Sequence, residues 1–115
     1  MQYLEDIKVG HKVSFGSYHV TREEVLEFAG KYDPQPFHLD EEAGRNGPFG
    51  VLSASGWHTG SDWMKCYVAA NKAAEAKIRA EGRAPAPVGP SPGIANLRWL
   101  KPVAPGDTIS YRTTV

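Results

Sequence analysis

Residues 56–81 read GWHTGSDWMKCYVAANKAAEAKIRAE and form the longest stretch of the chain with a helical period. Trp57, Gly60, Met64, Tyr67, Val68 and Asn71 recur at helical spacing, and all but Asn71 are apolar or small. Gly82 follows and ends the pattern. The spacing predicts a buried helix about 39 Å long, with a kink or break near Asn71 as an alternative. Its small residues would let a sheet approach closely.

Three other segments alternate as β-strands do: residues 11–20, 94–103 and 108–115. We expect the first to bend at Gly16. The turn sequence Ala104-Pro105-Gly106-Asp107 joins the other two, which predicts a hairpin between them. Residues 83–93 contain four prolines and predict a stiff connector without helix or strand.

A shorter helix is predicted for residues 21–32. Thr21 and Glu24 have the spacing of a capping box, in which each side chain accepts a hydrogen bond from the other residue's backbone N–H. Its inward face would consist of Val25, Phe28, Ala29 and Tyr32. Tyr32 would act there either as a core residue or as a positioner of the segment that follows. A helical turn is predicted at residues 40–43 and a loop at residues 44–50.

The segment between these elements, residues 32–40, reads YDPQPFHLD. Pro34 and Pro36 fix their own φ angles, lack backbone donors and push the preceding residues toward extended conformations. We therefore predict a stiff loop with no regular structure. Such a loop would hold the carboxylate of Asp33 and the imidazole of His38 at a set separation, as general acid–base catalysis requires.

Two other interpretations of this segment remain open. Asp-Pro is a common turn opener, and a histidine after a turn is often only a solvated side chain. A metal site could be drawn from Asp33, His38 and Asp40, but three such ligands without a fourth are weak evidence. We therefore predict no metal.

Residues 28–40, FAGKYDPQPFHLD, followed by residues 50–58, GVLSASGWH, resemble the hydratase signature of the MaoC-like dehydratases. This family includes the (R)-specific enoyl-CoA hydratases of the hot-dog superfamily. The similarity runs from Glu5-Asp6 to the segment Leu97–Val103, with Gln35 where Asn is the commonest residue.

The resemblance implies an α+β hot-dog fold, in which an antiparallel sheet wraps a long central helix. It also implies hydration of the double bond of a 2-enoyl-CoA or a related acyl thioester, without a cofactor. Asp33 and His38 would hold the nucleophilic water, and the backbone N–H of Gly56 would bind the thioester carbonyl oxygen. Substrate contacts are further implied for Ser55, Gln35, Tyr32 and Trp57.

Two alternative functions belong to different classes. A hot-dog thioesterase would use a carboxylate on the central helix, where Asp62 is available. A non-catalytic subunit would bind acyl thioesters without converting them. His58 is interpreted as a side chain at the helix start rather than a catalyst.

Composition limits the partners. The chain has 115 residues, 13 basic and 13 acidic side chains and no net charge, which gives no electrostatic footprint for nucleic acid or an anionic membrane. Cys66 is the single cysteine and favours a reducing compartment. No apolar run reaches the roughly 20 residues of a membrane span, and residues 1–6 do not resemble a signal peptide. We predict a cytoplasmic protein.

Three predicted strands are few for a hot-dog sheet. We expect one domain over residues 1–115 that is shortened at its C-terminus. Either assembly supplies the missing strands or the domain is truncated. The apolar stripe of the long helix needs a cover, so we expect a homodimer or a larger homo-oligomer.

Overall fold

The computed structural model describes residues 3–115. The elements follow in the order η1 (Leu4–Asp6), β1 (Lys12–His19), α1 (Arg22–Tyr32), α2 (Pro36–Leu39), α3 (Glu41–Arg45), α4 (Gly56–Ala80) and β2 (Thr108–Thr114). Met1 and Gln2 lie outside the described residues. The structure therefore covers only residues 3–6 of the segment that we predict not to be a signal peptide.

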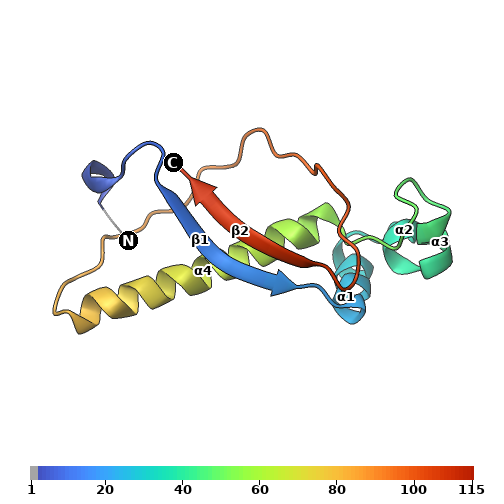
Figure 1. The fold of residues 1–115 in the computed structure, drawn as a ribbon, viewed down its shortest axis with the longest axis horizontal. Coiled ribbons are helices and arrows are strands. Elements are labelled where there is room, and N and C mark those ends of the chain that lie inside the picture. Colours follow the sequence, from blue (N-terminus) through green and yellow to red (C-terminus); the bar gives the residue numbers. More distant parts are fainter. Residues whose placement is uncertain (1–2) are drawn as a thin grey trace.

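The long helix α4 runs without interruption through Asn71, so the alternative of a break there is wrong. The two strands cross α4 on one side, and α1 to α3 gather at its N-terminal end (Figure 1). A long helix against an antiparallel sheet is the arrangement that the resemblance to the hot-dog superfamily implies. Within residues 3–115, no helix combines the length and apolar character needed to cross a membrane.

The two strands pair antiparallel, from Lys12 opposite Thr114 to His19 opposite Thr108. The register shifts between Ser14 and Gly16, and Gly16 has a φ of 88°. This bulge confirms the expected bend, since glycine adopts positive φ without steric cost. Phe15, the extra residue, meets Trp63 and Tyr67 of α4 edge-on, with ring centroids 6.0 and 5.3 Å away.

The predicted hairpin between residues 94–103 and 108–115 is wrong. The turn itself forms, because Asp107 donates its N–H to the Ala104 carbonyl and accepts from the Ala104 N–H. However, β2 pairs with β1, and residues 94–103 form no strand. These residues cross the start of α4 instead. Pro102 has no backbone N–H and cannot donate a hydrogen bond to a neighbouring strand.

A small core lies where α1, the turn before β2 and the segment before α4 meet. Val20, Val25, Leu52 and Ala54 are its buried members. Val20 exchanges two backbone hydrogen bonds with the turn, donating to Asp107 at 2.9 Å and accepting from Gly106 at 2.8 Å. The capping box at Thr21 and Glu24 is present, so α1 begins as predicted and turns Val25 and Ala29 inward.

The segment after α1 is more regular than predicted. Asp33 and Gln35, which precede prolines, leave the helical region as expected. Pro36, however, begins the one-turn helix α2, which carries His38. The prediction of an irregular loop failed because the fixed φ of proline suits the first position of a helix as well as a turn. Helix α3 likewise extends to Arg45, two residues beyond the predicted turn.

Gly44 of α3 offers a test of how the helical segment is held against the chain before α4. A Cβ there would lie 2.5 Å from backbone atoms of Leu52, which cannot rotate away. We predict that Gly44→Ala lowers the free energy of unfolding in urea by about 1–3 kcal/mol. Gly30→Ala is the matched control, because no atom lies within 4 Å of the added methyl group. It should raise stability by about 1 kcal/mol. A parent-like Gly44→Ala variant would contradict the contact.

Candidate active site

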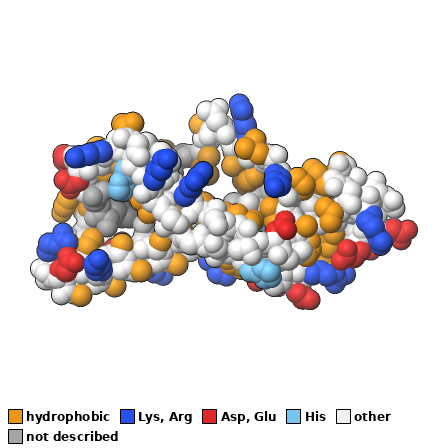
Figure 2. Space-filling view, in the orientation of Figure 1, with side chains coloured by type: hydrophobic (Ala, Val, Ile, Leu, Met, Phe, Trp, Pro, Cys, Tyr) orange, Lys and Arg blue, Asp and Glu red, His pale blue; other side chains and the backbone are white. Residues whose placement is uncertain are grey.

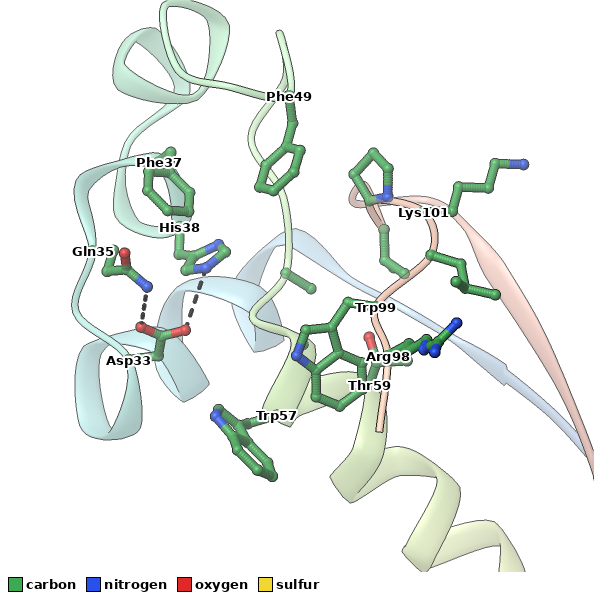
Figure 3. A pocket seen from close by; sticks show the side chains of 15 residues that line it. Asp33, Gln35, Phe37, His38, Phe49, Trp57, Thr59, Arg98, Trp99 and Lys101 are labelled. Carbon is green, nitrogen blue, oxygen red and sulfur yellow. Dashed lines mark hydrogen bonds and ion pairs between the residues drawn. The ribbon is translucent and has the colours of Figure 1, made fainter. Parts of the chain in front are cut away.

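A cleft of about 640 Å³ opens between the α1–α2 segment, the start of α4 and residues 98–103 (Figure 3). Its floor and walls are largely aromatic or aliphatic, contributed by Phe37, Phe49, Trp57, Trp99, Leu100 and Val103. Asp33 and His38 lie together on one side. The cleft therefore combines an apolar lining with one acid–base pair, which is the usual character of a small-molecule site.

The acid–base pair is held from three directions. His38 Nε2 lies 3.3 Å from Asp33 Oδ2, and the two side chains are 6% and 17% exposed. The other carboxylate oxygen of Asp33 accepts a hydrogen bond of 2.7 Å from the Gln35 amide. On its far side, His38 Nδ1 lies 2.6 Å from the Ser53 carbonyl oxygen. Neither side chain can turn away without breaking a hydrogen bond.

The contact with Ser53 fixes where the imidazole carries its protons. A carbonyl oxygen can only accept, so Nδ1 must donate. The neutral ring then has its lone pair on Nε2, the nitrogen that faces Asp33. The Asp33 carboxylate and the Nε2 lone pair repel each other. Either the ring therefore carries a second proton, on Nε2, or a donor such as water lies between Nε2 and Asp33.

The carboxylate of Asp33 is favoured in its charged form. Burial raises its pKa, but hydrogen bonding with the Gln35 amide and the Ser55 hydroxyl and the nearby His38 outweigh burial, so the pKa is lowered from its ordinary value. Asp33 is consequently ionised at neutral pH and can accept a proton or hold a donor.

The start of α4 faces the same cleft. Ser55, fully buried, caps the helix by accepting a hydrogen bond from the Trp57 N–H at 3.3 Å. Gly56 lines the cleft, and within residues 3–115 its N–H has no recorded acceptor. An unused donor at a helix N-terminus carries partial positive charge and suits an oxygen that gains negative charge.

Trp99 explains why residue 56 is a glycine. A Cβ at Gly56 would collide with carbon and nitrogen atoms of the Trp99 indole. Trp57, at the next position, meets the same indole edge-on with ring centroids 5.7 Å apart. Sequence reasoning placed Trp99 on a strand and missed this contact, for which no local pattern gives a signal.

Of the predicted site residues, Asp33, His38, Gln35, Gly56 and Trp57 meet at this cleft, with Ser55 buried beside Asp33. Tyr32 does not line it. Its side chain is 70% exposed and borders a smaller cleft of about 230 Å³ on the α1–α4 side. Sequence reasoning missed Ser53 and the wall formed by residues 98–103, including Arg98 and Lys101.

A second histidine–carboxylate pair lies inside α4. His58 Nε2 is 3.4 Å from Asp62 Oδ2, one helical turn away, and both side chains are buried. The His58 ring stacks on Phe28 with centroids 4.8 Å apart. His58 Nδ1 and Asp62 Oδ2 make no hydrogen bond within residues 3–115. Asp62 does not line the larger cleft, which does not favour the thioesterase alternative.

Asp40, the third ligand of the metal site considered from the sequence, is engaged elsewhere. Its carboxylate caps α3 by accepting from the Ala43 N–H at 2.9 Å. Within residues 3–115, no group of three or more His, Cys, Asp or Glu side chains comes close enough to hold a metal ion.

The buried pair predicts a dependence of stability on pH. Burial raises the pKa of Asp62, and this effect exceeds the opposing effect of His58. Since folding raises this pKa, the stability of the parent is present at low pH and is lost as pH rises through the unfolded-state value toward the folded one. In thermal melts from about pH 4 to about pH 7, the melting temperature of Asp62→Asn should gain on that of the parent. Glu23→Gln, at an exposed carboxylate, is the control. A constant difference across this range would contradict the prediction.

Three solved structures resemble the whole arrangement. A MaoC-like dehydratase from Rhodospirillum rubrum is 36% identical, with a TM-score of 0.78 over 100% of this chain and 70% of that one. A structure titled monoamine oxidase regulatory protein, from Archaeoglobus fulgius, is 26% identical, with a TM-score of 0.73 over 96% and 68%. The unliganded R-hydratase PhaJ1 from Pseudomonas aeruginosa, 23% identical with a TM-score of 0.54 over 94% and 61%, shares the fold.

Sequence comparisons agree with this likeness. The uncharacterized protein YdeM of Bacillus subtilis (strain 168) is 36% identical over 56 residues, which are 49% of this chain and 40% of YdeM. The chain thus matches less than half the length of this relative. The model of the MaoC-like domain family matches residues 6–115. The chain belongs to the MaoC-like domain family and has its hot-dog fold.

Proposed function

We propose that the chain hydrates the double bond of a 2-enoyl thioester, with coenzyme A as the carrier, and catalyses the reverse dehydration. Membership of the MaoC-like family supports a hydratase or dehydratase. The observation that carries the proposal is the pair of Asp33 and His38, 3.3 Å apart at the edge of an apolar cleft.

The nucleophilic water would lie against both members of the pair. Asp33, whose pKa is lowered, accepts a proton from this water while the water oxygen attacks the β-carbon of the substrate. Nδ1 is engaged by the Ser53 carbonyl, so Nε2 is the nitrogen that faces Asp33, and a doubly protonated His38 would deliver its Nε2 proton to the α-carbon. A proton passing from Asp33 back to His38 restores the starting state, so one water is consumed and no cofactor is needed.

The thioester carbonyl would point at the N-terminus of α4. Negative charge develops on its oxygen as the β-carbon is attacked, and the free N–H of Gly56 would meet it with a fixed donor. The hydrophobic acyl group would lie along the aromatic lining of the cleft, beside Trp57 and Trp99. Gln35, which holds Asp33, would act by orienting the base rather than by touching the substrate.

We predict that Asp33→Asn and His38→Ala each lower kcat for crotonyl-CoA hydration by about 10²-fold or more, the usual contribution of a general acid or base. Loss of absorbance of the enoyl thioester measures hydration, and release of free thiol would instead indicate hydrolysis. His19→Ala is the matched control, because this histidine is exposed on β1 and does not line the cleft. Circular dichroism verifies folding. Parent-like rates in both site variants would refute the assignment.

We also propose that the domain acts as a homodimer. Trp57, Met64 and Val68 of α4 are 60%, 47% and 40% exposed. Hydrophobic side chains also reach the surface in several separate places on the face in Figure 2. The radius of gyration is 17.4 Å, whereas a compact domain of this length would have about 13 Å. A second copy would cover the apolar face and one free sheet edge.

Sedimentation equilibrium at micromolar concentration tests this arrangement. We expect twice the mass of the chain, and Met64→Glu should shift the equilibrium toward monomers because burying a charge in an apolar interface is costly. Ala73→Glu, at an exposed position on the opposite side of α4, tests whether any added charge has the same effect. A compact monomer with full hydratase activity would refute the dimer.

A further inference from the structure

Two cations line the cleft on the side away from the acid–base pair. We infer that Arg98 and Lys101 bind an anionic group of the substrate, either a phosphate of the coenzyme A carrier or a carboxylate at the far end of the acyl chain. This inference rests on the proposed function, since it concerns the same cleft. It adds what that proposal leaves open, namely how the charged part of the substrate is recognised.

The charges in the cleft are separated. Asp33 is the one carboxylate among its lining residues, and Gln35 and His38 already contact its two oxygens. Figure 3 shows Arg98 and Lys101 on the far side of Trp99 from that pair. An elongated substrate could therefore place its double bond at the pair and an anion at the cations, with its uncharged middle on the aromatic lining.

Both cations are free of protein partners. Within residues 3–115, neither Arg98 nor Lys101 takes part in an ion pair, whereas Arg22, Lys31 and Arg83 each contact a glutamate. Their attraction for an anion is thus not already satisfied by a neighbouring carboxylate. A guanidinium binds phosphate or carboxylate through two parallel hydrogen bonds, and an ammonium adds a point charge.

The backbone that carries them is anchored, although it forms no strand. Trp99, next to Arg98, lies directly against Gly56 of α4. Val103, two residues after Lys101, accepts a hydrogen bond of 2.8 Å from the Ala54 N–H. Lys101 lies between the two anchors and Arg98 directly precedes the first of them, so the backbone at both cations is held on the cleft wall. A substrate anion would then bind at a set distance from the reacting atoms.

The experiment compares three thioesters in the parent and in Arg98→Gln/Lys101→Gln. Crotonyl-pantetheine carries no anion, crotonyl-CoA adds the phosphates, and glutaconyl-pantetheine adds a carboxylate on the acyl chain. The readout is kcat/KM for each anionic thioester divided by kcat/KM for crotonyl-pantetheine. Because the two cations are exposed and screened by solvent, we expect one of these ratios to fall about tenfold. Lys72→Gln, an exposed cation of α4 outside the cleft, should leave both ratios unchanged.

The outcomes distinguish the two anions. A fall confined to crotonyl-CoA identifies a carrier phosphate, and a fall confined to glutaconyl-pantetheine identifies an acyl carboxylate. Unchanged ratios for both thioesters overturn the inference. Calorimetric titration with coenzyme A, with the saturated glutaryl-pantetheine and with pantetheine repeats the comparison without turnover. Failure of hydration in the parent therefore counts against the proposed function, while equal binding by parent and double variant counts against the anion contact.

Discussion

The buried backbone from Leu52 to Ser55 is the constraint on which the rest of the structure depends. All four residues are buried, so their N–H and C=O groups must find partners inside the protein. The Ser53 N–H donates to the Phe37 carbonyl, and the Ala54 N–H donates to the Val103 carbonyl. The α2 turn and the 98–103 segment, which form two walls of the cleft, are thereby attached to one strip of chain that leads directly into α4.

The same strip determines the chemistry of the site. The Ser53 carbonyl needs a donor because it is buried, and His38 Nδ1 provides it at 2.6 Å. That hydrogen bond directs Nε2 toward Asp33 and fixes which nitrogen is left for the reaction. Two positions further on, Ser55 caps α4 and contributes to the lowered pKa of Asp33. The hydrogen bond that satisfies the buried Ser53 carbonyl is therefore also the one that orients His38 toward Asp33.

What the sequence could predict follows from the range of the interactions involved. The capping box at Thr21 and the length of α4 depend on residues within one or two turns, and both are confirmed. The fate of residues 94–103 depends on which partner β2 selects, and alternation alone does not specify a partner. The contact of Trp99 with Gly56 joins positions more than forty residues apart, so a glycine at the helix start could be recognised while the residue that requires it could not.

The two histidine–aspartate pairs show why residue identity alone does not make a site. Their separations are nearly equal, 3.3 Å for His38 and Asp33 and 3.4 Å for His58 and Asp62. Asp33 also receives hydrogen bonds from neutral groups and its pKa is lowered, whereas Asp62 Oδ2 has no hydrogen bond within residues 3–115 and burial raises its pKa. The first carboxylate stays charged beside a cleft that a substrate can enter, and the second holds a proton more strongly than a free carboxyl group does, inside the protein. Donors and access, rather than the pairing of an acid with an imidazole, make Asp33 and His38 the better candidates for acid–base chemistry.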